Sequence, residues 1–194
     1  MFLSAAARPR PDFDGKIGLW RIAEPKTAEK KSKNHTRGDV YDKDVTMTAE
    51  RYFTLMTKKV MPAIRDAFQP LSQIKEVIVQ QDGAKPHTGK DVVNRMNAIG
   101  ETMTPRIRVV TQPAQSPDMN VNDLAFFRAL DVAVRKSRRG MKQGKFNKRK
   151  LVSDVLAAFR AYPEEQLEKM WDYKSYVMQA VSVDGGNDYE RHRK

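Results

Sequence analysis

Two aspartates follow segments that favour β-strands, and their positions suggest a shared site. Asp82 comes directly after the β-rich run Ile74–Gln81, and Asp123 stands in the first turn of the helix expected after the next strand. Sites in open α/β sheets form at the carboxyl ends of strands, and a helix dipole stabilises a carboxylate in its first turn. The two carboxylates therefore suit a hard divalent cation such as Mg²⁺ or Mn²⁺.

Asp123 is expected at the top of a buried helix face. The positions that share its face are all apolar: Phe126, Phe127, Leu130 and Val134. A carboxylate that points toward a core needs a cation, and no Lys or Arg stands one turn before it. Taken singly, each aspartate is explained more simply as a turn residue after a strand or as a helix cap.

Two sequence motifs around these aspartates favour the metal-ligand interpretation over a turn or cap role. Residues 80–87 read Gln-Gln-Asp-Gly-Ala-Lys-Pro-His, and residues 112–124 read Gln-Pro-Ala-Gln-Ser-Pro-Asp-Met-Asn-Val-Asn-Asp-Leu. They resemble the two downstream motifs of the mariner-type DDE/DDD transposases. The spacing of Asp82 and Asp123 resembles the plant and oomycete-like branch, which has an aspartate in third place. Two long strings in order and at the right spacing are more specific than one short pattern.

The resemblance implies a ribonuclease H-like catalytic domain that cleaves and transfers DNA strands. In that family three carboxylates hold two Mg²⁺ ions, which clamp the attacking and leaving oxygens of the phosphodiester. Asp82 would be the second of these carboxylates and Asp123 the third. The first would lie on a central strand before Met1, between the N-terminal hairpin and the strand that ends at Asp82, so the domain is expected to be truncated.

The absent first carboxylate leads us to expect an inactive chain. Asp12 and Asp14 lie at the expected tip of the hairpin and are not expected to replace it, and Gly83 stands where the family commonly has asparagine. Two carboxylates would bind one metal weakly at most. Whether the chain is an enzyme is therefore left open, and the alternative is a non-catalytic basic nucleic-acid-binding protein derived from a transposon.

The charge of the chain points to DNA as a partner. The formal net charge is +12 and the isoelectric point is about 9.9, and cations that meet phosphates release condensed counterions. The residues expected to contact nucleic acid are Lys85, His87, Arg135, Lys136, Arg138, Arg139, Lys148, Arg149 and Lys150. The alternatives are a surface or structural role for His87, and a solvated loop or a nuclear import signal for the basic run 135–150.

The first half of the chain should supply a hairpin and one long helix. Residues 1–7 and 16–22 are expected to form two strands, of which the second alternates, on either side of a Pro-rich turn with an Asp-Gly pair. Residues 24–44 are polar and Lys-rich and predict an exposed basic loop. Thr48 should cap a helix whose apolar stripe reaches Phe68, with an interruption at Pro62.

The second half should alternate strands and helices and end in helices. Strands are expected at 74–81 and 106–112, and helices at about 89–99, 121–135, 148–162 and 163–182. Strand–helix–strand units imply parallel pairing, whereas the leading hairpin is antiparallel. We therefore predict one α/β domain over residues 1–194, with a truncated ribonuclease H-like mixed sheet and C-terminal helices.

The sequence also excludes several classes of protein. It has no cysteine, which excludes disulfides and cysteine-ligated zinc. No apolar run approaches the ~18–20 residues that a membrane span needs, and the apolar start at residues 1–7 is too short for a signal peptide. We expect an intracellular, nuclear protein without membrane contact that is compatible with a homodimer.

Overall fold

The computed structural model describes residues 1–33, 35–71, 73–138 and 148–184. It begins with the predicted antiparallel hairpin of β1 (Phe2–Ala6) and β2 (Lys16–Arg21), in which Ser4 lies opposite Leu19. The turn requires Gly15, whose φ is +80° and whose added Cβ would lie 2.6 Å from the carbonyl oxygen of Ala7.

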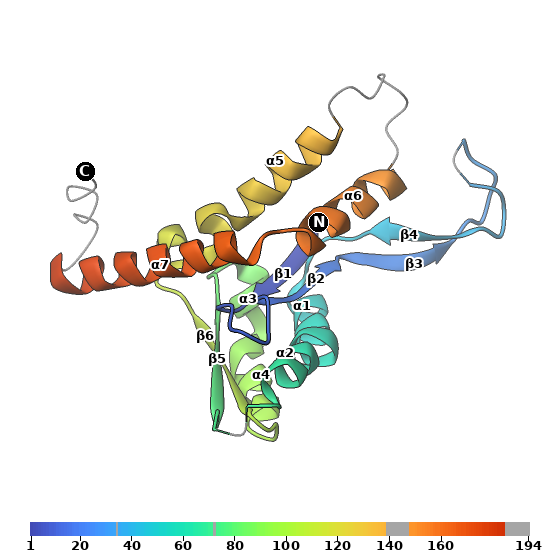
Figure 1. Ribbon diagram of the computed structural model, residues 1–194. Helices are drawn as coiled ribbons and strands as arrows, with labels where there is room; N and C mark the ends of the chain where they lie inside the picture. The colour runs from blue at the N-terminus through green and yellow to red at the C-terminus, as the bar shows by residue number, and fades with distance from the viewer. Residues whose placement is uncertain (34, 72, 139–147, 185–194) are drawn as a thin grey trace.

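A second hairpin replaces the loop predicted over residues 24–44. Strands β3 (Ala23–Thr27) and β4 (Val40–Asp44) pair antiparallel and project from the body as an arm (Figure 1). Arg21 ties the arm to the body through Asp44, at 2.7 Å, and Asp42, at 3.4 Å. The prediction of exposure is right, but that of a loop is wrong, because backbone pairing and cross-strand contacts need no buried apolar side chain.

The expected long helix contains one wide turn. The Thr48 hydroxyl accepts the backbone N–H of Arg51 at 3.3 Å and caps α1 (Ala49–Leu55), as predicted. A π-helical segment, η1 (Met56–Val60), then leads into α2 (Met61–Phe68). Pro62 lies in the first turn of α2, where its missing N–H is tolerated. The predicted interruption at Pro62 is confirmed as this π turn.

A parallel strand pair carries the first candidate aspartate. Strands β5 (Glu76–Gln81) and β6 (Arg106–Thr111) pair in parallel. The connection contains the short helix α3 (Lys85–Thr88), the single 3₁₀ turn η2 (Gly89–Asp91) and α4 (Val92–Gly100). Helix α4 lies close on β6, because Asn97 bonds both the N–H and the C=O of Val109, at 2.7 and 3.1 Å.

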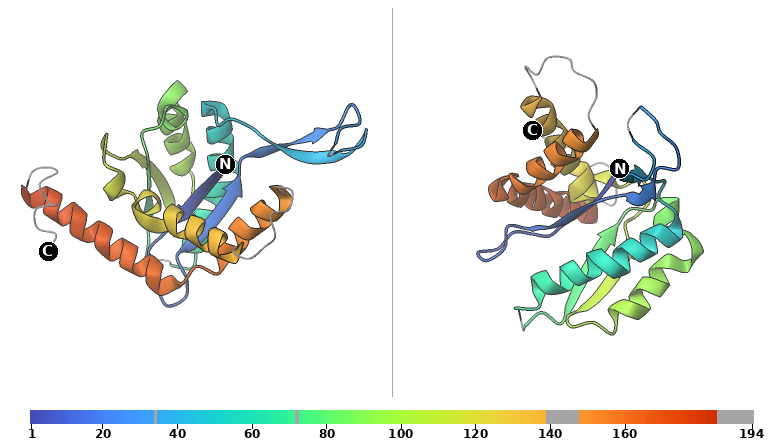
Figure 2. Two further views of the ribbon diagram at one scale, coloured as in Figure 1. Left: turned by 90° about the horizontal axis from the view of Figure 1, so that it is seen from above. Right: turned by 90° about the vertical axis from the view of Figure 1, so that its right-hand side faces the viewer.

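The remaining helices follow the second strand pair. A 3₁₀ turn, η3 (Pro117–Met119), precedes the π-helical segment η4 (Asn122–Phe126) and α5 (Phe127–Ser137). The chain continues with α6 (Lys148–Arg160) and the long α7 (Glu164–Asp184), close to the predicted bounds. The strands lie between two helical layers, with α1, α2 and α4 on one side and α5, α6 and α7 on the other (Figures 1 and 2).

Each helical layer has its own apolar core. On one side Met61, Met96 and Ile107 are almost completely buried between the helices and the strands. On the other side Phe126 and Leu167 are fully buried, and Phe126 packs edge-on against aromatic neighbours. Burial of this kind supplies most of the driving force for folding.

The strands form three separate two-stranded sheets, β1–β2, β3–β4 and β5–β6. The predicted mixture of antiparallel and parallel pairing in an α/β fold is confirmed, but the described residues do not join these pairs into one sheet. Within the same residues, no helix is long and apolar enough to cross a membrane.

Candidate metal site and nucleic-acid interface

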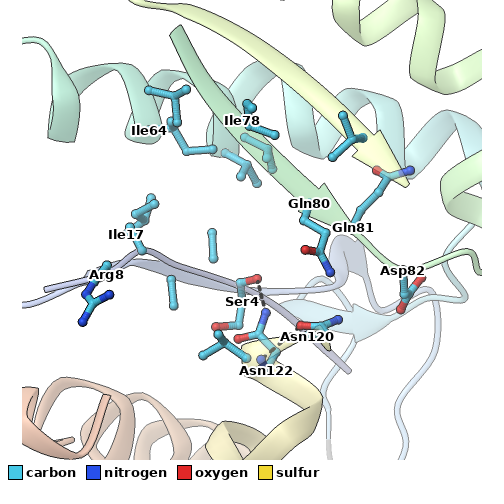
Figure 3. Close-up of a pocket in the computed structure, with 18 of the residues that line it drawn as sticks. Ser4, Arg8, Ile17, Ile64, Ile78, Gln80, Gln81, Asp82, Asn120 and Asn122 are labelled. Carbon is cyan, nitrogen blue, oxygen red and sulfur yellow. Dashed lines mark hydrogen bonds between the residues drawn. The ribbon is translucent and has the colours of Figure 1, made fainter. Parts of the chain in front are cut away.

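A cavity of about 680 Å³ lies between β1 and β5, and both candidate aspartates line it. Figure 3 shows Asp82 at the carboxyl end of β5, with Ser4 of β1 and Asn122 of η4 across the opening. The structure therefore brings together the loop after β5 and the helix after β6. Because the carboxyl ends of parallel strands share one edge, both loops reach the same end of the cavity.

Asp82 is held by its own loop. Its Oδ1 accepts the backbone N–H of Ala84 at 2.9 Å and lies 2.6 Å from Nδ1 of His87. The first bond closes a tight turn of the kind that aspartate favours after a strand. Within the described residues both bonds use the same oxygen, so Oδ2 keeps its lone pairs free for a ligand. The turn role and the ligand role, alternatives in the sequence, are compatible in the structure.

A buried network orients His87 toward Asp82. The hydroxyl of Tyr52, a residue that is only 2% exposed, donates to Oε1 of Gln81 at 2.7 Å. The Gln81 amide donates to the carbonyl oxygen of His87 at 2.9 Å, and the rings of Tyr52 and His87 stack at 4.0 Å. Burial, with a smaller contribution from the charge of Asp82, raises the pKa of Tyr52, so the phenol stays protonated.

Sequence reasoning missed this network. Tyr52 belongs to the apolar stripe of the first long helix and was interpreted only as a core residue. The signal in the sequence that could have indicated this network is Gln81, a polar residue at the end of a β-rich run and directly before Asp82. In the structure Gln81 is buried. His87 is a positioned neighbour of the carboxylate, with a side chain 16% exposed. Its expected contact with nucleic acid stays a prediction.

Asp123 differs from its prediction in one respect. It lines the cavity but is itself exposed, and Phe127, expected on the buried face, is 40% exposed. The other three apolar positions of that face are buried, as predicted, and the helix begins with the π-helical segment η4. Asn120 donates to Oδ2 of Asp123 at 3.0 Å and fixes the carboxylate.

The electrostatics at Asp123 favour a cation. Burial on the protein side of the carboxyl raises its pKa, and the negative charge of Asp82 raises it further. A divalent ion between the two carboxylates would offset that repulsion. The described residues contain no cluster of three or more His, Cys, Asp or Glu side chains that could hold a metal. The carboxylates of Asp82 and Asp123 are the candidate ligands for such an ion.

Lys174 is a cavity residue that the sequence did not suggest. It reaches from α7 to donate to Oε1 of Gln80 at 2.9 Å, and burial lowers its pKa. Gln80 also donates to the carbonyl oxygen of Met119, at 2.9 Å. Gln80 thereby connects β5 to both the second aspartate loop and the last helix.

The predicted nucleic-acid contacts fall in two places. Lys85 is exposed on α3, beside the Asp82 loop. The described members of the basic run lie at the facing ends of α5 and α6, and Arg139 lies outside the described residues. These members, which we call the α5–α6 basic patch, are Arg135, Lys136, Arg138, Lys148, Arg149 and Lys150.

Ion pairs occupy part of the α5–α6 basic patch. Arg135 pairs with Asp131 at 2.8 Å, and Lys148 pairs with Asp44 of the β3–β4 arm at 2.5 Å. Arg138 and Lys150 share Asp154, at 3.7 and 3.4 Å. The Arg135–Asp131 and Lys148–Asp44 pairs are exposed and therefore weak, so a phosphate can replace the carboxylate partner, whereas Asp154 is largely buried, with 15% of its side chain exposed.

Comparison with known proteins identifies a similar fold. Neither the family models nor the curated proteins give a match. The structure is similar to the crystal structure of the catalytic domain of Mos1 mariner transposase, with a TM-score of 0.54 and 19% sequence identity. The similarity covers 77% of this chain and 69% of that one. It shows that the mixed α/β fold is shared with that catalytic domain.

Proposed function

We propose that this chain is a transposase-derived domain in which Asp82 and Asp123 form a site for one divalent cation, Mg²⁺ or Mn²⁺. The observation that carries the proposal is that both aspartates line one cavity, where the charge of Asp82 raises the pKa of Asp123. The fold shared with a mariner transposase catalytic domain supports it. So do the two motif strings, which place these aspartates second and third in a DDE/DDD arrangement of the plant and oomycete-like type.

The residues around the two aspartates would orient the cation. His87 and the Ala84 N–H bind Oδ1 of Asp82, which leaves Oδ2 as the ligand atom. Asn120 holds Oδ2 of Asp123 in the same way and leaves Oδ1 as the ligand. A bound cation would supply Lewis acidity toward a phosphodiester oxygen.

Strand cleavage needs more than these residues supply. Two carboxylates cannot position two metal ions on opposite sides of a phosphodiester, and the loss of one positioned metal removes several kcal/mol of transition-state charge stabilisation. The family strand that would carry the first carboxylate lies, by the resemblance, where the cavity separates β1 from β5. We therefore propose that the 194 residues by themselves do not cut DNA.

DNA is the proposed partner, and a nuclear location and a homodimer belong to the same proposal. The net charge of +12 and the α5–α6 basic patch favour phosphate contact. This patch also favours the second candidate function, a non-catalytic DNA-binding protein. The two candidates differ in the requirement for the cation, because phosphate contact by the patch does not involve Asp82 or Asp123.

A plasmid assay separates these functions. We expect the purified chain to bind DNA in EDTA and in Mg²⁺, to give no nicked circles from supercoiled plasmid, and to bind as well after Asp82→Ala or Asp123→Ala. Mg²⁺-dependent nicking that either substitution abolishes would refute the proposed inactivity. Failure to bind DNA at low salt would refute the proposed partner.

The α5–α6 basic patch can be tested by the salt dependence of DNA binding. Each phosphate contact contributes about −0.9 to the slope of log K against log salt. We expect Lys136→Ala and Arg149→Ala each to make the slope shallower by about one contact. Lys58→Ala is the matched control, because Lys58 is also exposed but lies on η1 in the opposite helical layer. A slope that changes equally in all three variants would refute the patch.

A further inference from the structure

The far end of the β3–β4 arm carries a cluster of cations. Beyond the last strand pair, Thr27 opposite Val40, the chain has two carboxylates, Glu29 and Asp39, and more basic side chains than acidic ones. These basic side chains, which we call the arm-tip cations, are all exposed and are Lys30, Lys31, Lys33 and Arg37. The ion pairs of the arm involve other side chains, and among the described residues no arm-tip cation has a carboxylate partner.

The carboxylates of the two arm strands lie nearer the body and are paired there. Arg51 of α1 binds Glu24 at 2.6 Å, and Arg21 of β2 binds both Asp42 and Asp44. The arm therefore keeps its neutralised charges at its base and its free positive charges at its far end. A solvated surface needs only interspersed charges of both signs, so this separation favours contact with a polyanion.

The far end of the arm is held in a defined shape. The rings of His35 and Tyr41 stack at 3.8 Å, and the backbone N–H of Thr36 donates to Oδ2 of Asp39 at 2.7 Å. The N–H of Ser32 donates to the carbonyl oxygen of His35 at 2.8 Å. A two-stranded hairpin is marginal by itself, so these contacts and the ion pairs at the base keep the arm extended. A preformed projection loses less conformational freedom when it binds.

The arm lies beside the α5–α6 basic patch. Lys148, at the start of α6, pairs with Asp44 at the base of the arm. Near the far end, the hydrogen bond from Thr36 lowers the pKa of Asp39, and the positive charge of Arg149 lowers it further. The first residues of α6 therefore face the arm, and Figures 1 and 2 show α6 and the arm on the same side of the molecule. The patch and the arm-tip cations are parts of one basic surface.

The length and width of this surface suit duplex DNA. Arg37 precedes Asp44 by seven residues, and a strand rises about 3.3 Å per residue, so the arm tip lies about 20 Å from the patch. Duplex DNA presents one phosphate per ~1.7 Å of its axis, or about a dozen over that distance. The major groove, about 12 Å wide, also admits a two-stranded β-ribbon.

We propose that the arm-tip cations contact the phosphates of the same DNA duplex that the α5–α6 basic patch binds, so that the chain holds the duplex at two places about 20 Å apart. Four of the six patch cations are paired with carboxylates, whereas a phosphate at the arm tip displaces none. The inference rests on the proposed DNA partner and adds a second contact region to it.

A matched pair of double variants tests the arm. Lys30→Ala/Lys31→Ala and Lys58→Ala/Lys59→Ala each remove two adjacent, exposed lysines and change the net charge equally, but the second pair lies on η1. Fluorescence anisotropy with a labelled duplex of about 20 base pairs, roughly 70 Å long, gives the affinity at several salt concentrations. The arm variant should make the slope of log K against log salt shallower by about 1.8, and the control should leave it unchanged.

Lysine acetylation of the unmodified chain keeps the test independent of the variants. The reaction is followed by mass spectrometry with and without the duplex. Bound DNA should slow the acetylation of the arm-tip lysines severalfold, and these are Lys30, Lys31 and Lys33. The internal control is the η1 pair, Lys58 and Lys59, whose acetylation should not change.

The outcomes separate this inference from the proposed function. If the patch variants change the salt slope but the arm variant does not, the arm contact is overturned and the DNA partner stands. Equal changes in the arm and η1 variants, or arm-tip lysines that DNA does not protect, would also overturn the arm contact. Failure of the unmodified chain to bind the duplex at low salt would overturn both proposals.

Discussion

The buried hydrogen bond from Tyr52 to Gln81 provides a quantitative test of the site's construction. We predict that Tyr52→Phe destabilises the fold while it leaves the ring stack on His87 in place. The substitution removes one oxygen atom, so it creates no large void. Its effect comes from Gln81, a residue only 6% exposed, whose Oε1 loses the donor that lies 2.7 Å away.

The magnitude follows from the burial of both partners. An acceptor left unsatisfied in the interior costs about 1–3 kcal/mol of unfolding free energy. In a domain of 150–250 residues each kcal/mol corresponds to about 2–4 °C in Tm. We therefore expect Tyr52→Phe to lower the free energy of unfolding by about 2 kcal/mol and Tm by about 4–8 °C.

Urea unfolding followed by circular dichroism measures this change directly. Tyr176→Phe is the matched control, because Tyr176 lies on α7 with 41% of its surface exposed. The control should change the unfolding free energy by less than about 0.5 kcal/mol, as surface substitutions usually do. If Tyr52→Phe also stays within that range, the Tyr52–Gln81–His87 network does not orient Asp82 through a buried hydrogen bond.

Two further predictions concern packing and pH. Gly100→Ala should destabilise the fold by more than about 2 kcal/mol, because its Cβ would lie 1.8 Å from the carbonyl oxygen of Ile107 and force α4 off β6. Gly83→Ala, whose added Cβ would lie 3.8 Å from the Thr111 side chain, should be neutral in the same urea titration. The raised pKa of Asp123 means that the folded state binds its proton more tightly, so stability falls as pH rises from the ordinary value of 3.8 through the raised one. Asp123→Asn in EDTA should therefore gain stability relative to the unmodified chain as pH rises through the ordinary value of 3.8 and above it, and a difference that stays constant as pH rises would contradict the assignment.

Local signals in the sequence predicted most elements correctly. The Asp-Gly turn correctly predicted the β1–β2 hairpin. Thr48, together with the apolar stripe that follows it, correctly predicted the first long helix. The β3–β4 arm escaped prediction because its strands are held by backbone pairing and by Arg21, and not by an alternating apolar face. Low hydrophobicity in this segment indicates exposure but does not exclude paired strands.

The candidate site was predictable in part. The two motif strings single out Asp82 and Asp123, and both line one cavity, but the helical period did not predict that Asp123 and Phe127 are exposed. Lys174 reaches Gln80 across 94 positions of sequence, a contact that follows from how α7 crosses the strands. The Tyr52–Gln81–His87 network is likewise tertiary, since it joins a helix, a strand end and a loop.

The most direct test of the central claim is a Mn²⁺ titration of the metal-free chain followed by electron paramagnetic resonance, which measures free Mn²⁺. The account predicts one bound ion per chain, and loss of that binding in both Asp82→Asn and Asp123→Asn. At a Mn²⁺ concentration of ten times Kd, the ion should also stabilise the unmodified fold by about 1.4 kcal/mol. Equal binding by the chain and both variants, or no binding at all, would contradict a shared cation site at residues 82 and 123.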